Sequence, residues 1–256
     1  MEKEYSFEGA FRDCRNDGIA NLMVQSMISK STCVVHQMSE GRSGDVKFYR
    51  FVNNNGITRE EMEESFYNHT YNEVSGREVL IIQDTCEFNF NAFREQFDEN
   101  DPDLGTVGNG SDIGFFNHCS MVIDAKSSVP IGFSDIQLYN RSYHPEKKKS
   151  EVRRKIPIQE KESYRWIKAI EHSTEVCSKA SRRWFVSDRE SDIYAVYTCV
   201  HEPENYFVVR AAQNRIVQDK KGGQRLLDFI ESKEIIGQYD SEVVDKKTQE
   251  KEVLAI

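Results

Sequence analysis

Two short apolar runs in this chain each lead into an aspartate. Residues 79–82 continue through Gln83 to Asp84, and residues 184–186 continue through Ser187 to Asp188. A carboxylate that follows a buried strand is costly to bury unless a charge neutralises it, and a hard divalent cation can do so. Either aspartate alone could instead lie in a solvated turn. Because there are two, we predict one metal site that the fold assembles.

Composition is ordinary for a globular protein. The 256 residues can bury a sizeable core, with 30% charged and 38% apolar residues. No apolar run is long enough to span a membrane, and the N-terminal MEKEYSFEGAF lacks the apolar core of a signal peptide, so we expect a cytoplasmic protein. The six cysteines and six histidines are dispersed. They predict reduced thiols and argue against zinc or a histidine-based metal centre.

Charge is distributed unevenly along the chain. A net charge of -9 argues at first against a nucleic-acid partner. Residues 141–230, however, hold 19 Lys and Arg against 13 Asp and Glu, so this stretch carries +6 and the remainder carries -15. A basic run of this kind either forms a solvated loop or contacts phosphates. Its cations include Lys147, Lys148, Lys149, Arg153, Arg154, Lys155, Lys161, Arg165 and Lys168.

The N-terminal 75 residues are predicted to be helical. Apolar residues at helical spacing indicate a helix over residues 8–31, which Gly18 weakens or splits. Residues 45–52 form a second segment, which ends at an asparagine cluster beginning with Asn53. Thr58 followed by Glu61 predicts a capping box that opens a helix over residues 59–66. Small helical modules bind DNA or only pack against a neighbour, and composition leaves both possibilities open.

From residue 78 onward the pattern changes to strands. The glycine-spaced residues 91–114 predict a mobile hairpin connection, and GTVGNG lacks the features of a phosphate-binding loop. The expected order is three strands, a helix, a strand, a helix and a strand. That order is typical of an α/β (α+β) fold with a ribonuclease-H-like mixed sheet, which brings acids from its first and fourth strands together. The expected ranges are 78–84, 115–124, 130–139, 162–179, 183–187, 190–201 and 205–211.

Four motifs in register resemble the insertion-sequence-type DDE transposases of IS family four, which are bacterial cut-and-paste enzymes that excise DNA through a hairpin. The motifs are IIQDTCEFNF at residues 81–90 with the spaced glycines after it, SDRESDIY at 187–194, YFVVRAAQNR at 206–215, and FYRFVNNNGIT at 48–58. The last is similar to the signature of that family's N-terminal DNA-binding domain. The resemblance spans about residues 5–220.

The resemblance implies a function and a set of site residues. Asp84 and Asp188 would be the first two acids of the catalytic triad and would bind two Mg²⁺ ions, which Mn²⁺ can replace, for phosphodiester cleavage and joining. The partner would be double-stranded DNA, at transposon ends and target, bound by a homodimer. The DNA-contacting positions would be Arg50, Asn53, Arg189, Arg210 and Asn214.

Two of these cations also have simpler interpretations. Arg210 could form an ion pair on an edge strand. Arg189 could pair with Glu190 or Asp192 instead of holding a phosphate. Both alternatives remain open at the level of sequence.

The chain also departs from the family pattern. Cys86 replaces a common threonine, Ile19 replaces a usual arginine, and the tyrosine–arginine–glutamate–lysine signature that carries the third acid is not found. The expected domains are a helical DNA-binding domain at 1–75, a catalytic core at 76–220 and an incomplete inserted β-rich segment at 221–256. We therefore expect a C-terminally truncated enzyme with very low activity by itself.

Two alternatives follow from the missing acid. The chain could be a non-catalytic, DNA-binding regulator of transposition that derives from a truncated transposase. It could also be a ribonuclease-H-like nuclease unrelated to transposition, with a third acid chosen from Glu190, Asp192 or Glu87.

Overall fold

The chain forms two compact units, Met1–Arg210 and Ala211–Ile256. The computed structural model describes residues 6–98, 101–108, 110–141, 155–199, 202–219, 222–235, 237, 240–244 and 251–255. Most of the predicted basic run, including Lys147, Lys148, Lys149, Arg153 and Arg154, lies outside the described residues. Among the described residues, no helix has the length and apolar character needed to cross a membrane.

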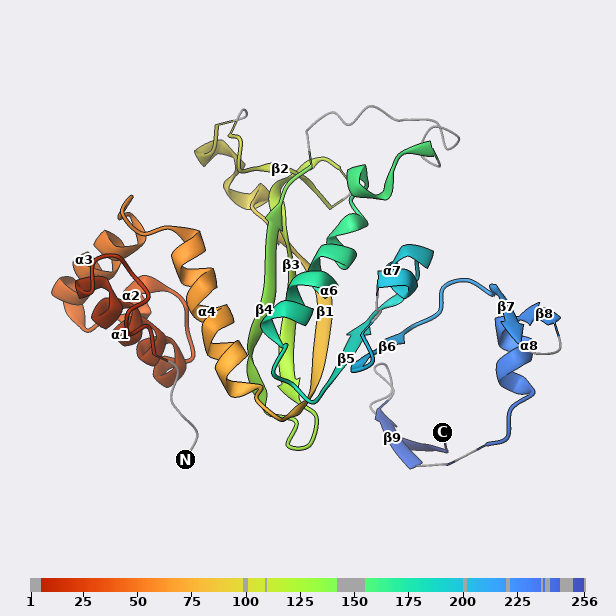
Figure 1. Ribbon diagram of the computed structural model, residues 1–256. Helices are drawn as coiled ribbons and strands as arrows, with labels where there is room; N and C mark the ends of the chain where they lie inside the picture. Colours follow the sequence, from red (N-terminus) through yellow and green to blue (C-terminus); the bar gives the residue numbers. More distant parts are fainter. Residues whose placement is uncertain are drawn as a thin grey trace. The chain divides into compact units, whose positions relative to one another are not determined.

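The first unit begins with four helices, α1 (Arg15–Lys30), α2 (Val35–Met38), α3 (Gly41–Val52) and α4 (Arg59–Glu73) (Figure 1). The helix expected from residue 8 begins only at Arg15, because the Asp17 carboxylate accepts hydrogen bonds from the backbone N–H groups of Gly9 and Phe11. Gly18 does not interrupt α1. The helices enclose an apolar core of Phe7, Phe11, Ala20, Met23, Met38, Phe48 and Phe51.

The beginning of α4 has the predicted capping box. The Thr58 hydroxyl accepts from the Glu61 N–H, and the Glu61 carboxylate accepts from the Thr58 N–H. The helix continues to Glu73, beyond the predicted residue 66, because its later turns also find buried partners. Met62 and Phe66 pack on the helical core, while Tyr67 packs on the core of the sheet.

A six-stranded mixed sheet follows, so the first unit is an α+β fold. Strand β3 pairs antiparallel with β1 on one side and with β2 and β4 on the other. On the far side of β1, strands β5 and β6 run parallel to it. The strands are β1 (Glu78–Asn89), β2 (Gly105–Val107), β3 (Asp112–Asp124), β4 (Pro130–Tyr139), β5 (Arg182–Ser187) and β6 (Asn205–Val209).

The segment expected to be a mobile hairpin connection contains regular structure. It holds a 3₁₀ helix, η1 (Asn91–Gln96), the short strand β2 and the first residues of β3. Gly114 permits the tight spacing at this end, because a side chain there would meet the Phe88 backbone carbonyl oxygen. Phe88 and Phe115 also stack with ring centroids 4.8 Å apart, which extends the β1–β3 ladder beyond the predicted strand.

One face of the sheet is covered by α6 (Tyr164–Val176) (Figure 1). Its apolar residues follow the 3.6-residue period, so Trp166 and Ile170 point into the sheet and are almost fully buried. They contact a cluster in which Val79, Ile81 and Phe185 come from the strands. The short helix α7 (Tyr194–Cys199) adds Val196 to this core.

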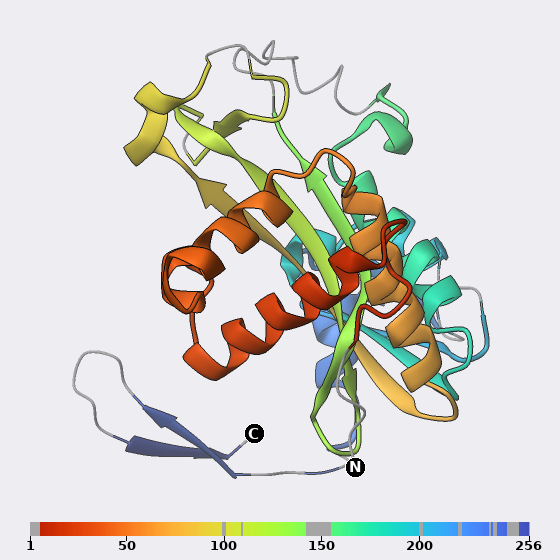
Figure 2. The same cartoon turned by 90° about the vertical axis from the view of Figure 1, so that its left-hand side faces the viewer.

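Helix α4 runs along the outer edge of β4 (Figure 2). The Tyr67 hydroxyl accepts from the Ile136 N–H at 3.0 Å, and the Thr70 hydroxyl donates to the Phe133 carbonyl at 2.8 Å. Gly132 allows this approach, because a side chain there would clash with the Thr70 hydroxyl. The helix thereby satisfies backbone groups that an edge strand otherwise presents for pairing with another chain.

The second unit contains two hairpins and a short helix. Strands β7 (Ile216–Asp219) and β8 (Gly222–Arg225) pair antiparallel and lead into α8 (Leu226–Glu231). Strands β9 (Asp240–Val244) and β10 (Lys251–Ala255) form the other pair.

We expect Thr70→Val to lower the free energy of unfolding by about 1–3 kcal/mol, because it removes the hydroxyl of the buried Thr70, which donates to the Phe133 carbonyl. Chemical denaturation would measure the change. Thr198→Val is the matched control. Its hydroxyl is exposed and, among the described residues, bonds to Ala195 of its own helix, so a change within about 0.5 kcal/mol is expected. Equal effects of both substitutions would contradict the role of Thr70 at the strand edge.

Candidate active site

Asp84 lies in β1, and Asp188 directly follows the neighbouring strand β5. The parallel register of β1 and β5 ends at the pair Gln83↔Ser187, and each aspartate is the next residue of its chain segment. Strand β1 does not end there, as the sequence had indicated, but continues to Asn89 as the partner of β3. The two aspartates therefore hold equivalent positions on the lines of β1 and β5, where β5 leaves the sheet.

Both aspartates point to the face of the sheet opposite α6. Successive side chains of a strand alternate between its faces, and the preceding residue Gln83 is buried on the α6 side. Asp188 continues the extended conformation of β5, with φ -80° and ψ -173°. Both carboxylates are exposed, so a solvent-borne ligand can reach them.

Each carboxylate uses one oxygen locally. Asp84 Oδ1 accepts from the Thr85 N–H at 2.7 Å, and Asp188 Oδ1 accepts from the Glu190 N–H at 2.8 Å, where Asp188 caps the 3₁₀ helix η3 (Arg189–Ser191). Neither Oδ2 atom has a hydrogen-bond or ion-pair partner among the described residues. Two hard carboxylate oxygens suit Mg²⁺, which commonly takes one or two carboxylates and completes its shell with water and substrate phosphate.

The three other acids considered from the sequence are engaged elsewhere. Glu190 pairs with Arg165 at 2.8 Å, Asp192 accepts from the Tyr197 hydroxyl at 2.6 Å, and Glu87 accepts from the Gly108 N–H at 2.8 Å. In the described part of the chain, no group of three or more His, Cys, Asp or Glu residues is arranged to hold a metal. The structure therefore brings together Asp84 and Asp188 and does not add a third acid to them.

A hydrogen-bonded network lies under the carboxylates on the α6 side. Arg165, in the first turn of α6, donates from Nε to the Thr85 hydroxyl at 3.2 Å and from a terminal nitrogen to Glu190 at 2.8 Å. The Thr85 hydroxyl also bonds to His118 Nδ1 at 2.9 Å. These contacts were not predicted from the sequence, where Arg165 was only one of several cations in a basic run.

His118 forms the buried end of this network. Its ring packs edge-to-face on Trp166, with centroids 4.5 Å apart, and burial together with the nearby Arg165 charge lowers the pKa of His118 to about 4. The neutral ring therefore accepts from the Thr85 hydroxyl, which in turn accepts from Arg165. His118 Nε2 is buried and has no partner among the described residues.

Two thiols flank Asp84 on the open face of the sheet. Cys119 lies directly opposite Asp84 in the β1–β3 register, and Cys86 is two residues along β1. Burial, with smaller effects from Cys86 and Asp84, raises the pKa of Cys119. Cys119 therefore stays a neutral thiol at pH 7, and the donor set at this position is one of hard oxygens.

Arg189 and Arg210 are exposed cations near the end of β5. The Arg210 N–H donates to the Ser187 carbonyl at 3.3 Å, which places it one residue from Asp188 along the β5 line. Among the described residues, neither guanidinium has an ion-pair partner. Glu190 pairs with Arg165, and Asp192 accepts from the Tyr197 hydroxyl, so each acid that was considered as a partner of Arg189 bonds to another residue.

Arg50 lies on an open groove of about 650 Å³ between α1 and α3. Arg42 and Lys47 line the same groove, and in the part of the chain that the structure describes none of the three cations pairs with an acid. Asn53 ends α3 as predicted, and its side-chain amide donates to the Tyr49 carbonyl at 2.8 Å. The exposed surface of α3 is therefore locally cationic although the chain is acidic.

Asn214 belongs to the second unit, whereas the other predicted positions belong to the first. Its side-chain oxygen accepts from the Leu227 N–H at 3.0 Å and so helps to cap α8.

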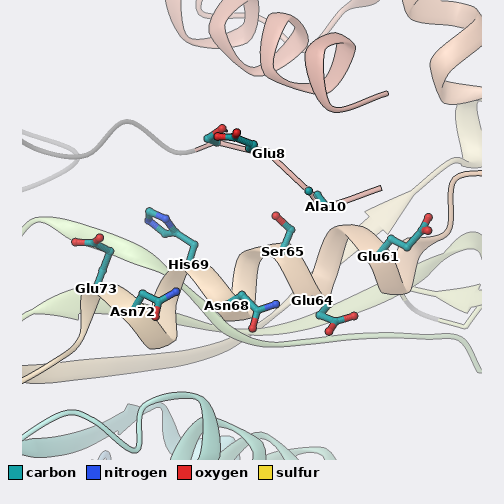
Figure 3. Close-up of a pocket in the computed structure, with 11 residues that line it drawn as sticks. Glu8, Ala10, Glu61, Glu64, Ser65, Asn68, His69, Asn72 and Glu73 are labelled. Atoms are coloured by element: carbon teal, nitrogen blue, oxygen red, sulfur yellow. The ribbon is translucent and has the colours of Figure 1, made fainter. Parts of the chain in front are cut away.

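Another groove, of about 480 Å³, separates residues 6–10 from α4 (Figure 3). Glu8 faces the helix surface that carries Glu61, Glu64, His69 and Glu73. The four glutamates that line this groove, Glu8 included, disfavour an anionic ligand. This groove and the groove at Arg50 thus differ in the sign of their charge.

Comparisons with known proteins give a structural likeness but no match in sequence. No family model and no curated protein matches the chain. Among solved structures, the chain is similar to the piggyBac transposase synaptic complex with hairpin DNA determined by cryo-EM, with a TM-score of 0.38 and 10% sequence identity. The match covers 89% of this chain and 46% of that chain, so this chain spans less than half of that transposase's length. A score this low does not establish a common fold.

We expect the protein to lose up to about 3 kcal/mol of stability as pH falls from about 6.5 to about 4, through His118 alone. In that window the unfolded chain takes up a proton that the folded chain does not, so protonation favours unfolding. His118→Phe keeps a ring against Trp166 and removes the titration. As pH falls across this window, the free energy of unfolding should fall more in the unaltered protein than in His118→Phe. A difference between the two free energies that is constant with pH would contradict a buried neutral His118.

Proposed function

We propose that this chain is a DNA-binding protein of the DDE transposase type, with a ribonuclease-H-like core that acts on DNA phosphodiesters. The observation that carries the proposal is the placement of Asp84 and Asp188 on adjoining lines of a mixed sheet. The strand order β4-β3-β1-β5-β6 supports it, because β3 runs antiparallel to β1, β4 runs antiparallel to β3, and β5 and β6 run parallel to β1, as in ribonuclease-H-like sheets.

In this proposal Asp84 and Asp188 hold Mg²⁺ or Mn²⁺ through their free oxygens. The bound ion would polarise a phosphodiester and stabilise the charge that develops on its oxygens. The two carboxylates supply the negative charge that attracts the cation, and their exposure leaves room for a phosphate beside them. Arg189 and Arg210, unpaired within the described residues, are suited to hold the flanking phosphates.

The helical region is proposed to contact the DNA duplex, with residues 1–75 as a binding domain and 76–220 as the core. Arg42, Lys47 and Arg50 present free cations on one side of α3, and an α-helix of this kind fits the major groove. Asn53 is occupied at the end of the helix, so its contribution would be to fix that end of α3. Residues 221–256, with Asn214 just before them, are proposed to begin an inserted β-rich segment, and two copies of the chain to act together on DNA.

A second candidate, a non-catalytic regulator that binds the same DNA, is favoured by one observation. Glu87, Glu190 and Asp192, the acids near the aspartate pair, are all held by other groups. With two carboxylates, the site retains the capacity to bind one cation and a phosphate, while cleavage would be weak. Binding without cutting is the outcome that distinguishes the regulator from the enzyme.

The test is a nicking assay on duplex DNA that carries the ends of the proposed mobile element, with Mg²⁺ or Mn²⁺, run beside a gel shift on the same DNA. We expect Asp84→Asn to reduce metal-dependent nicking by at least about 100-fold, because one of two carboxylate ligands is lost. DNA binding should be unchanged or stronger, since an acid near phosphate is removed. Asp103→Asn, a substitution of an exposed carboxylate in the β2 connection, is the matched control.

Four results are informative. Nicking that depends on Asp84 and Asp188 supports the enzyme, and binding without nicking supports the regulator. Nicking that is unchanged in Asp84→Asn contradicts the site, and no binding to any duplex contradicts both candidates.

DNA binding should depend on the cations of α3 in a salt-dependent way. Each phosphate contact contributes about 0.9 to the slope of log affinity against log salt concentration, so Arg50→Ala should reduce the slope by about 1 and the triple alanine variant of Arg42, Lys47 and Arg50 by about 3. Arg15→Ala is the control, because Arg15 already pairs with Asp13 at 2.6 Å. A slope that responds equally to Arg15→Ala and Arg50→Ala would refute α3 as the contact surface.

A further inference from the structure

We propose that Arg165 is a positioning residue, which joins the segment that carries Asp84 to the segment that carries Asp188 from the opposite face of the sheet. The proposal rests on the proposed function, in which these two carboxylates form the metal site. Arg165 itself does not contact that site. Its role is to hold the two acids at a constant spacing.

The need for such a link follows from the sheet register. Parallel pairing of β1 with β5 ends at Gln83↔Ser187, immediately before the two aspartates. Asp84 remains fixed by the β1–β3 ladder, where it pairs with Cys119. Asp188 has left the ladder and begins η3, whose own bonds tie it to Ser191 on the same segment. A contact that reaches from β1 to η3 therefore determines where Asp188 lies relative to Asp84.

Arg165 makes this contact through two different nitrogens. Its Nε bonds to the hydroxyl of Thr85, the residue after Asp84, and its terminal nitrogen bonds to the carboxylate of Glu190, two residues after Asp188. The planar guanidinium holds its donors in a fixed fork, so the positions of Thr85 and Glu190 are fixed relative to one another. A lysine carries the same charge but is a compact point donor on a flexible stem, and it cannot reproduce this fork.

The side chain of Arg165 is itself immobilised. It is only 10% exposed, another nitrogen donates to the Glu162 carbonyl at 3.2 Å, and the guanidinium carbon lies 5.3 Å from the centroid of the Trp166 ring. Trp166 is part of the buried core under the sheet. Because Arg165 packs on this core residue, its contacts fix both aspartate segments relative to the core.

The geometry also separates Arg165 from the reacting groups. The Thr85 side chain lies on the α6 side of the sheet, where it bonds to His118, whereas Asp84 and Asp188 point to the other side. Arg165 therefore acts through Thr85 and Glu190 and is not placed to bind substrate phosphate.

The test combines metal binding with hydrogen exchange on the full chain. Mn²⁺ affinity, followed by electron paramagnetic resonance of the free ion, should fall about 10- to 100-fold in Arg165→Lys and in Thr85→Val, as for other residues that orient metal ligands. Thr85→Ser keeps the hydroxyl and should restore affinity close to that of the unaltered protein. Because Arg165 and Thr85 act through one bond, the double variant should lose less than the product of the single losses.

Arg183→Lys is the matched control for general destabilisation. Arg183 is only 3% exposed in the same sheet and bonds to Glu202 and Asn205, at the other end of β5. It should lower thermal stability without changing Mn²⁺ affinity by more than about twofold. In the exchange experiment, Arg165→Lys should raise amide exchange in both residues 84–89 and residues 188–193, and Arg183→Lys should raise it in neither.

The possible failures can be told apart. If Asp84→Asn leaves Mn²⁺ affinity unchanged, the metal site of the proposed function is wrong, and the role of Arg165 toward it is wrong as well. If Asp84→Asn abolishes binding while Arg165→Lys matches the unaltered protein, only the positioning role is overturned. Equal losses in Arg165→Lys and Arg183→Lys, or exchange that rises in one segment alone, also overturn it.

Discussion

Parallel pairing of β1 with β5 is the constraint on which the rest of the first unit depends. Val79, Ile81 and Phe185 alternate with less buried neighbours and lie under α6, so their burial selects one register. Shifting β5 by one residue would turn Phe185 away from the core. The same shift would send Asp84 and Asp188 to opposite faces. The hydrophobic core and the carboxylate pair are therefore specified by one alignment.

Prediction from sequence worked where a local pattern has a local cause. The strand at Pro130–Tyr139 and the capping box at Thr58 and Glu61 are found as expected, because strand alternation and helix capping depend on near neighbours. The two aspartates could be selected because an apolar run precedes each of them. Whether they act in catalysis stays a prediction.

Other features could not be read from local patterns. The start of α1 depends on the Asp17 carboxylate folding the preceding segment back, and β1 extends to Asn89 only because β3 pairs with it. The bond from Arg165 to Thr85 spans 80 residues, and composition shows only a cation among others. Contacts of this kind exist only after the sheet and α6 have come together.

Charge is sorted within the helical region even though the whole chain is acidic. The groove at α3 carries Arg42, Lys47 and Arg50, while the groove between residues 6–10 and α4 carries glutamates. Over distances shorter than the Debye length of about 8 Å, a ligand experiences this local charge more than the net charge of the molecule. A net charge of -9 is therefore compatible with an anionic partner on one surface.

Helix α4 belongs to two cores at once. Met62 and Phe66 are packed in the helical core, while Tyr67 and Thr70 bond to the backbone of β4. In mechanical terms, α4 is a rigid lever, with one end packed in the helical core and the other bonded to β4. A torque that a long polymer exerts on α3 would pass along α4 into β4, and from there across β3 to β1. In the proposed function, side-chain bonds at Tyr67 and Thr70 would thus determine how stiffly the orientation of DNA on α3 is coupled to the strand that carries Asp84.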